Sequence, residues 1–137
     1  MQLIDASVWV ASTDPADRFH ASARAVVANY ASPLAALDLT LYEVANVMGG
    51  KRGRPTEGRF LVRLIARRCR ENLVVAEADL LESAIELAAE HDLTAYDAAY
   101  VAAARRRGWT LVSCDVADLV SKGLAVTPDA SDYPLAG

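Results

Sequence analysis

The chain has 137 residues, of which 53% are hydrophobic and 23% charged, and its formal net charge is −4. A chain of this length is expected to fold as one domain, residues 1–137, with a core that needs no disulfide framework. The composition excludes an intrinsically disordered chain, and the negative net charge excludes a uniformly basic nucleic-acid binder. No segment reaches the roughly 20 apolar residues of a transmembrane helix, and no basic signal-peptide region precedes Asp5. We therefore expect a cytoplasmic protein without a membrane partner.

The first third of the chain alternates short apolar runs with amphipathic segments. Residues 1–4 predict a buried central strand, and an Asp-Pro pair predicts the start of a helix over residues 14–30. Residues 34–37 predict a second strand after a proline. A pair with capping-box spacing then predicts a helix over residues 40–48, which two glycines end.

A basic block occupies the middle of the sequence. Residues 49–58 contain four of the seven glycines, one proline and three basic residues, which predicts a mobile basic loop. The helix expected from Thr56 carries arginines at helical spacing on one edge, and these are Arg59, Arg63, Arg67 and Arg70. Residues 51–70 hold eight bases and one acid, whereas residues 71–100 hold eight acids and neither Lys nor Arg. The block can therefore form a local basic wall for an anionic partner such as RNA.

The second half of the chain continues the alternation of strands and helices. The predicted elements are a strand at 73–76, helices at 79–90 and 95–107, a strand at 109–113, a short helix at 116–122 and a fifth strand at 124–127. The tail at 128–137 is weakly patterned. This order predicts an α/β fold of three layers, α/β/α, with a parallel sheet of four to five strands.

An acidic residue stands at or near four strand-to-helix junctions, and these residues are Asp5, Glu43, Asp97 and Asp115. Each one alone could be part of a helix cap. Capping does not explain why Asp5 ends an otherwise apolar strand. In a parallel α/β sheet the carboxyl ends of the strands meet at one edge, so the acids can meet there. Four adjacent carboxylates are stable only with cations between them, which predicts a divalent-metal site and phosphodiester hydrolysis.

Polar neighbours of these acids are further candidates. The hydroxyls of Ser7 and Ser113 lie close in sequence to two of the acids. Asn46 follows Glu43 on the same helix face, where it could contact substrate or Glu43, or serve only as a polar residue near a helix end. Asp118 follows Asp115 by about one turn and is either an auxiliary ligand or a solvated acid.

Four segments around the acids resemble the acidic motifs of PIN domains. They are residues 3–8 (LIDASV), 42–47 (YEVANV), 96–102 (YDAAYVA) and 111–115 (LVSCD). The resemblance is strongest to the small VapC-like ribonuclease toxins of type II toxin–antitoxin modules, and it runs from Leu3 to about Asp118 in the family's order. The fourth segment has Ser113 where threonine is commoner, but serine keeps the hydroxyl.

The resemblance implies a PIN-like fold and a metal-dependent endoribonuclease that uses Mg²⁺ or Mn²⁺. Such proteins are usually dimeric and are held inactive by a cognate antitoxin. Carried over, the catalytic acids would be Asp5, Glu43, Asp97 and Asp115. We expect Asp5, Asp97 and Asp115 to be the main metal ligands, and Glu43 to bind through water or to orient the attacking hydroxide. The arginine edge would bind phosphates of the RNA substrate.

Two alternative functions remain open from the sequence. A phosphatase with Asp5 as nucleophile usually has a second acid two residues later and a helpful lysine. Here position 7 is serine, and the only lysines are Lys51 and Lys122. The other alternative is a non-catalytic metal- or RNA-binding module, which the residue pattern does not exclude.

Overall fold

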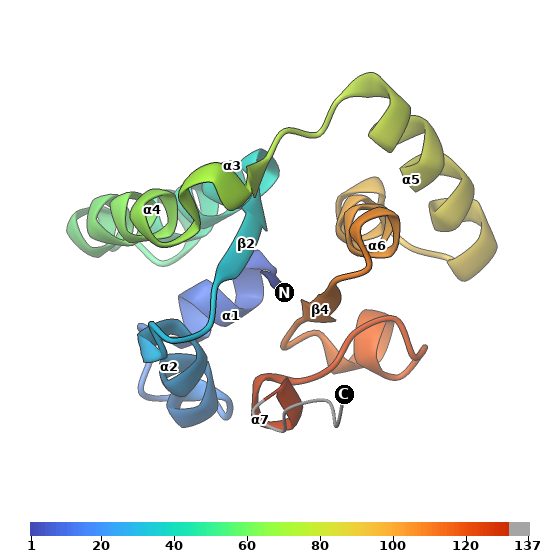
Figure 1. Ribbon diagram of the computed structural model, residues 1–137. Coiled ribbons are helices and arrows are strands. Elements are labelled where there is room, and N and C mark those ends of the chain that lie inside the picture. Colours follow the sequence, from blue (N-terminus) through green and yellow to red (C-terminus); the bar gives the residue numbers. More distant parts are fainter. Residues whose placement is uncertain (132–137) are drawn as a thin grey trace.

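The computed structural model describes residues 1–131, in which helices alternate with four strands (Figure 1). In chain order the elements are β1 Gln2–Ile4, α1 Ala6–Ala11, α2 His20–Ala28, β2 Leu34–Leu37, α3 Asp38–Asn46, the π-helical turn η1 Val47–Lys51, α4 Pro55–Cys69, the 3₁₀ turn η2 Arg70–Asn72, β3 Leu73–Val74, α5 Ala78–His91, α6 Ala95–Arg107, β4 Thr110–Val112, the π-helical turn η3 Val116–Val120 and α7 Pro128–Ser131.

The four strands form one parallel sheet in the order β3-β2-β1-β4. The first strand of the chain is therefore central, as predicted, and Ile4 lies opposite Val112 at its carboxyl end. Residues 124–127 do not form the predicted fifth strand, because their only sheet pairing within residues 1–131 is a bridge between Val126 and Val112. The prediction of a parallel α/β sheet is confirmed with four strands.

Side chains alternate along the strands between two hydrophobic clusters, one on each face of the sheet. In β2, Leu34 and Ala36 pack on one face, whereas Ala35 and Leu37 pack on the other. The first face is covered by α1 to α4, and the second by α5, α6 and η3 (Figure 1). Because both faces are covered, the strands are apolar except for Gln2 and Thr110 at the starts of β1 and β4, which is the pattern of a buried parallel sheet. None of the helices within residues 1–131 is long and apolar enough to cross a membrane.

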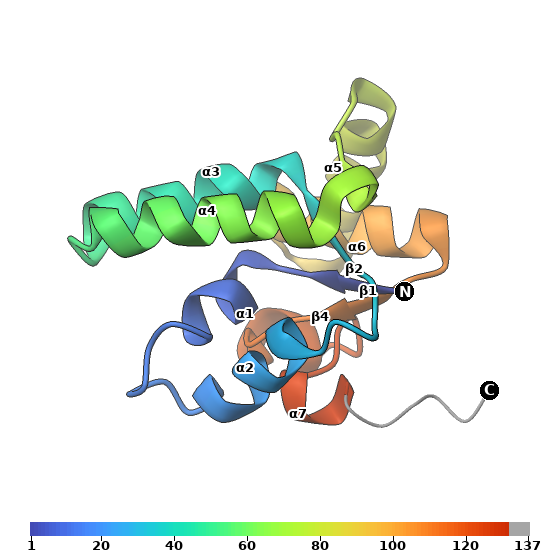
Figure 2. The ribbon, with the colours of Figure 1, turned by 60° about the vertical axis from the view of Figure 1, so that its left-hand side comes forward.

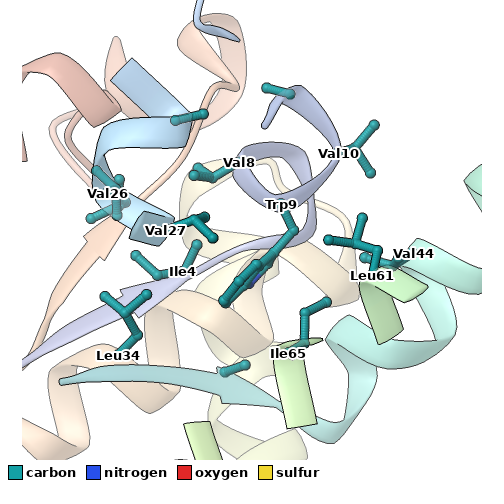
Figure 3. Packing of buried hydrophobic residues seen from close by; sticks show 14 of the residues in the cluster. Ile4, Val8, Trp9, Val10, Val26, Val27, Leu34, Val44, Leu61 and Ile65 are labelled. Atoms are coloured by element: carbon teal, nitrogen blue, oxygen red, sulfur yellow. The ribbon is translucent and has the colours of Figure 1, made fainter. Parts of the chain in front are cut away.

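Trp9 is the largest side chain in the core of the first face (Figure 3). It lies in α1 and is fully buried among Ile4 of β1 and the side chains of α4, which include Leu61 and Ile65. This packing fixes α1 next to the carboxyl end of β1, and Asp5 is the residue that joins the two elements.

The helix α1 was not predicted, and the helix after it starts later than predicted. Asp5 begins α1 by accepting a hydrogen bond from the Ser7 amide at 2.9 Å. Farther along, Asp14 accepts from the Ala16 amide at 3.0 Å, so the chain turns locally instead of entering a helix there. The predicted helix at 14–30 is therefore shortened to α2, which starts at His20.

The helix α3 starts earlier than predicted and continues into a helical hairpin. It begins at Asp38, and the Thr40 hydroxyl accepts from the Leu37 amide at 3.2 Å, so the predicted capping box of Thr40 and Glu43 is wrong. The prediction of a loop over residues 49–58 is also too long, because η1 extends α3 to Lys51 and α4 begins at Pro55. Proline is favoured at the first position of a helix, so it starts α4 here. Figure 2 shows α3 and α4 side by side along one face of the molecule.

Gly58 permits the close contact within this hairpin. It is buried in α4, and an added Cβ would lie 2.8 Å from the Met48 Cβ. We expect Gly58→Ala to destabilise the fold by about 1 kcal/mol or more, because overpacking outweighs the gain in helix propensity. Gly49→Ala is the matched control: a Cβ added at Gly49 would meet nothing within 4 Å, so little loss is expected. Urea unfolding of both variants measures the difference, and equal stability would contradict the close contact.

Candidate metal centre

The predicted acids gather at the carboxyl edge of the sheet, where β1 and β4 end side by side. The amide of Asp5 donates to the carbonyl of Val112 at 3.2 Å, so the first residue after β1 is held against the last residue of β4. Ser113 and Asp115 follow β4 directly. The acids on α3 and α6 complete the group, as the charge effects described below indicate.

Asp5 is the most buried of these acids, with 5% of its surface exposed. Its Oδ1 accepts from both the amide and the hydroxyl of Ser7. Burial raises the pKa of Asp5 to about 6, although hydrogen bonds from Ser113 and Ser7 act in the opposite direction. The nearby charge of Glu43 raises this pKa further. Asp5 therefore gives up its proton less readily than an ordinary aspartic acid.

The two candidate serines tie together the turns that follow β1 and β4. Ser7 Oγ accepts from the Cys114 amide at 2.9 Å and lies 3.5 Å from Ser113 Oγ. Ser113 Oγ in turn accepts from the Asp115 amide at 3.0 Å. These contacts position Asp5 and Asp115 relative to each other, so the two serines hold the acids in place through hydrogen bonds.

Three carboxylates come close enough to share one cation. Oxygens of Asp97, Asp115 and Asp118 lie within 4.8 Å of one another. Asp115 starts η3 by accepting from the Asp118 amide at 3.0 Å, and this tight turn brings Asp118 next to it. Burial raises the pKa of Asp97, and the charges of Asp115 and Asp118 raise it further. Like charges at this distance favour a cation between them.

Glu43 links the three-acid group to Asp5. It is half-buried on α3, and its Oε1 accepts a hydrogen bond from the Tyr100 hydroxyl at 2.7 Å. Burial raises the pKa of Glu43, the Tyr100 bond lowers it, and the charge of Asp97 raises it. Asp5 itself is not one of the three acids within 4.8 Å. The acids are therefore linked electrostatically in a chain, because the charge of Glu43 acts on Asp5 and the charge of Asp97 acts on Glu43.

The remaining candidates lie outside this chain of acids. Asn46 is exposed at the end of α3, and no hydrogen bond within residues 1–131 joins it to Glu43. The four side chains of the arginine edge are all exposed, and no ion pair in the described part of the chain joins them to the acids. Three of them lie on α4, but α4 ends at Cys69 and Arg70 begins η2 with a positive φ of 47°, so the prediction that Arg70 continues the helix is wrong. Arg68 differs from them, because it donates to the carbonyls of Val27 and Asn29 and lies over the Tyr30 ring.

Thr40 and Tyr100 belong to the site but were not predicted from the sequence. Tyr100 follows Asp97 by about one turn of α6 and is 1% exposed. Burial, and then the charges of Glu43 and Asp5, raise the pKa of Tyr100 well above its usual value, so its hydroxyl stays protonated. A tyrosine within a helix of buried alanines needs a partner for its hydroxyl, and this was the available signal.

The neighbouring thiol is not equipped to act as a nucleophile. Burial raises the pKa of Cys114 to about 12, and the charge of Asp5 acts in the same direction. The thiolate is the reactive form of cysteine, and it is suppressed here. Cys114 is therefore not a candidate nucleophile at this edge of the sheet.

Comparison with known proteins identifies the family. The model of the PIN domain family matches residues 3–117. Ribonuclease VapC3 of Pyrobaculum aerophilum is 36% identical over 117 aligned residues, covering 82% of this chain and 88% of that protein.

Solved structures share the fold. VapC20 of Mycobacterium tuberculosis, a toxin that cleaves the sarcin–ricin loop, has a TM-score of 0.68 at 24% identity and covers 90% of this chain and 95% of its own. A toxin–antitoxin complex from Klebsiella pneumoniae has a TM-score of 0.68 at 20% identity, covering 93% of this chain and 98% of the matched chain. The family match includes all four predicted acids, and the chain belongs to the PIN domain family.

Proposed function

We propose that this protein is a metal-dependent endoribonuclease, the toxin of a toxin–antitoxin pair, which hydrolyses RNA phosphodiester bonds in the cytoplasm. The observation that carries the proposal is the group of three carboxylates within 4.8 Å, to which Glu43 and, through it, Asp5 are coupled by charge. Membership of the PIN family and the ribonuclease name of the relative VapC3 support the same activity.

The residues present fit a hard divalent cation. Their donor atoms are all carboxylate oxygens, the type of ligand that suits Mg²⁺ and Mn²⁺. Asp97 and Asp115 would hold the ion, with Asp5 as the third predicted ligand and Asp118 as the auxiliary one. Burial, and then the charges of Asp115 and Asp118, raise the pKa of Asp97, and the contribution of these two charges supports a cation near the three side chains. When bound, the cation supplies positive charge for the scissile phosphate and acidifies a water molecule.

Glu43 is suited to handle the proton of the attacking water. Burial raises its pKa, so it binds a proton more readily than an exposed glutamate does. Tyr100 holds one of its oxygens, so the carboxylate has a fixed orientation beside Asp97. Glu43 would orient the water toward phosphorus and accept its proton, while Ser7 and Ser113 keep Asp5 in place.

The phosphatase alternative is poorly supported by the surroundings of Asp5. A nucleophilic carboxylate must be ionised and accessible to phosphorus. Asp5 is 5% exposed, its pKa is raised to about 6, and its Oδ1 is already bonded to Ser7. Its position favours support of a cation over covalent catalysis.

A cleavage assay separates the proposed nuclease from both alternatives. Purified protein is incubated with RNA in Mg²⁺ or Mn²⁺, and again with excess EDTA. We expect cleavage with metal, none with EDTA, and recovery when metal is restored. Undiminished cleavage in EDTA would contradict the metal-dependent mechanism, and binding of RNA without cleavage would favour a non-catalytic module.

We propose that the arginine edge, which runs along α4 to the start of η2, binds the RNA backbone. Arg59→Ala, Arg63→Ala, Arg67→Ala and Arg70→Ala should each weaken RNA binding and reduce the slope of log affinity against log salt by roughly one. Arg105→Ala is the control, because it removes an exposed charge of α6 outside this edge. Binding is measured in an Asp97→Asn background, in which no cleavage is expected. Slopes equal to the control for all four variants would place the RNA elsewhere.

We also propose two protein partners: a second copy of this chain and a cognate antitoxin. Exposed apolar side chains on the surface helices support protein interfaces, and they include Tyr42, Phe60 and Ile85, each at least 64% exposed. The antitoxin would place a basic side chain, most simply arginine, into the acid cluster. We expect a dimer by light scattering and a tight complex that suppresses cleavage. Monomers at micromolar and higher concentrations would contradict the dimer, and harmless overexpression of the folded, metal-bound protein alone would contradict the toxin.

A further inference from the structure

Three elements meet in a buried chain of hydrogen bonds that ends on Glu43. The Leu37 amide, at the end of β2, donates to Thr40 Oγ1 at 3.2 Å. Thr40 Oγ1 lies 2.8 Å from the Tyr100 hydroxyl, which lies 2.7 Å from Glu43 Oε1. Thr40 and Tyr100 are 0% and 1% exposed, so water does not compete for these contacts.

The donor and acceptor roles in this chain follow from the number of protons. A hydroxyl has one proton to donate, and an ionised carboxylate only accepts. The Tyr100 proton therefore goes to Glu43, which leaves Thr40 to donate to the Tyr100 oxygen. Every proton then points from the sheet toward Glu43, beginning with the fixed amide of Leu37.

The contact with Glu43 is more than a means of burying the Tyr100 hydroxyl. Thr40 would satisfy the Tyr100 hydroxyl even without Glu43, because Thr40 Oγ1 lies within hydrogen-bond distance of it. The contact matters more for the orientation of Glu43. Fixing a glutamate side chain costs up to about 2 kcal/mol of conformational entropy. Tyr100 offsets this cost by joining the side chain to α6 and, through Thr40, to the end of β2.

We infer that Tyr100 is a positioning residue, which holds Glu43 through Oε1 and leaves Oε2 for water or cation. The inference rests on the proposed function, because it assigns Glu43 a fixed orientation in that reaction. Within residues 1–131, no hydrogen bond to Glu43 Oε2 competes with this arrangement. Thr40 acts one step farther away, since it fixes the hydroxyl that fixes the carboxylate.

Tyr100→Phe tests the inference because it removes one oxygen and keeps the buried ring. Supporting residues around a metal ligand are typically worth about 10- to 100-fold in metal affinity or activity. We expect a loss of about tenfold or more in kcat and a several-fold weaker Kd for Mn²⁺, measured without RNA by calorimetry, with an unchanged KM for RNA. Tyr30→Phe is the control: that ring is 72% exposed beneath Arg68 and far from this hydrogen-bond chain in sequence. Tyr30→Phe should change neither kcat nor the Kd for Mn²⁺.

Two further comparisons separate positioning from a general effect on the fold. Thr40→Val should reproduce the losses in kcat and in Mn²⁺ affinity that are expected for Tyr100→Phe. Thr40→Ser should cause only small losses, because the hydroxyl remains. In a Glu43→Ala background, Tyr100→Phe should have no further effect on Mn²⁺ affinity. An equal loss in both backgrounds would overturn the inference.

The outcomes also distinguish this inference from the proposed function. A parent protein that cleaves RNA and binds Mn²⁺, with a Tyr100→Phe variant equal to it, would overturn positioning and leave the function standing. A parent that binds Mn²⁺ without cleaving RNA would overturn the proposed nuclease, while the calorimetric comparison still decides whether Tyr100 positions Glu43. A parent that does neither would overturn both.

Discussion

Asp97→Asn is expected to abolish RNA cleavage while the fold remains intact. Asp97 is the shared member of the site, because it belongs to the three-acid group and its charge also acts on Glu43. Asparagine keeps the shape and removes the negative charge that would bind the cation. A bound cation stabilises the charge of the transition state by several kcal/mol. We therefore expect the rate of cleavage to fall by at least about a thousandfold when the cation is no longer held.

The same substitution should not weaken the protein when metal is absent. Burial and the charges of Asp115 and Asp118 raise the pKa of Asp97, so ionised Asp97 is unfavourable in the metal-free fold. Asp97→Asn should therefore unfold at the same urea concentration as the parent in EDTA, or at a higher one. Asp92→Asn is the matched control, since Asp92 is exposed at the end of α5 in the left-handed region, which asparagine tolerates. Wild-type cleavage rates for purified Asp97→Asn would contradict the proposed site.

The metal-free protein should lose stability through Asp5 as the pH rises from about 4 to above 6. Burial raises the pKa of Asp5 from 3.8 to about 6, so in this window the folded state keeps a proton that the unfolded state releases. The stabilisation is complete below the unfolded pKa and is lost as the pH passes the folded one. At about 1.4 kcal/mol for each pKa unit, the total contribution is about 3 kcal/mol.

Asp5→Asn isolates this effect, because other titrating groups cancel in the comparison with the parent. Unfolding by urea in EDTA should give similar stabilities near pH 4, and the variant should be more stable than the parent by up to about 3 kcal/mol near pH 8. Adding Mg²⁺ at pH 8 should stabilise the parent more than the variant, because the cation offsets the charge of Asp5. A stability difference that does not change with pH would contradict the burial of an ionisable Asp5.

The sheet could be predicted from the sequence because its strands are mostly apolar and alternate with helices. The boundaries that failed have local causes. The sequence of α1, ASVWVA, is short and almost wholly apolar, and its residues from Val8 to Ala11 are all buried, so it lacks the one-sided pattern of a surface helix. The hairpin between α3 and α4 was hidden by its glycines, which indicate a loop, although Gly58 serves a close helix contact.

The candidate site could be predicted as a set of acids but not as a geometry. Strand ends in a parallel sheet converge, so the positions of Asp5 and Asp115 follow from the fold class alone. Sequence spacing does not reveal that the turn at η3 brings Asp118 within reach of Asp97 and Asp115. Nor does it reveal Tyr100, whose role depends on the folded chain bringing its hydroxyl on α6 to Glu43 on α3. The assignment of individual metal ligands therefore remains a prediction.

The position of Mn²⁺ in crystals tests the central claim most directly. Crystals of the parent protein are grown with MnCl₂, and the anomalous signal of manganese distinguishes the ion from water and from the light atoms of the protein. We predict a peak bonded to carboxylate oxygens of Asp97 and Asp115, beside Asp5 and Glu43, and we predict that Asp97→Asn removes it. A manganese peak elsewhere in a protein that Mn²⁺ activates, or an unchanged peak in Asp97→Asn, would contradict the metal centre proposed for this chain.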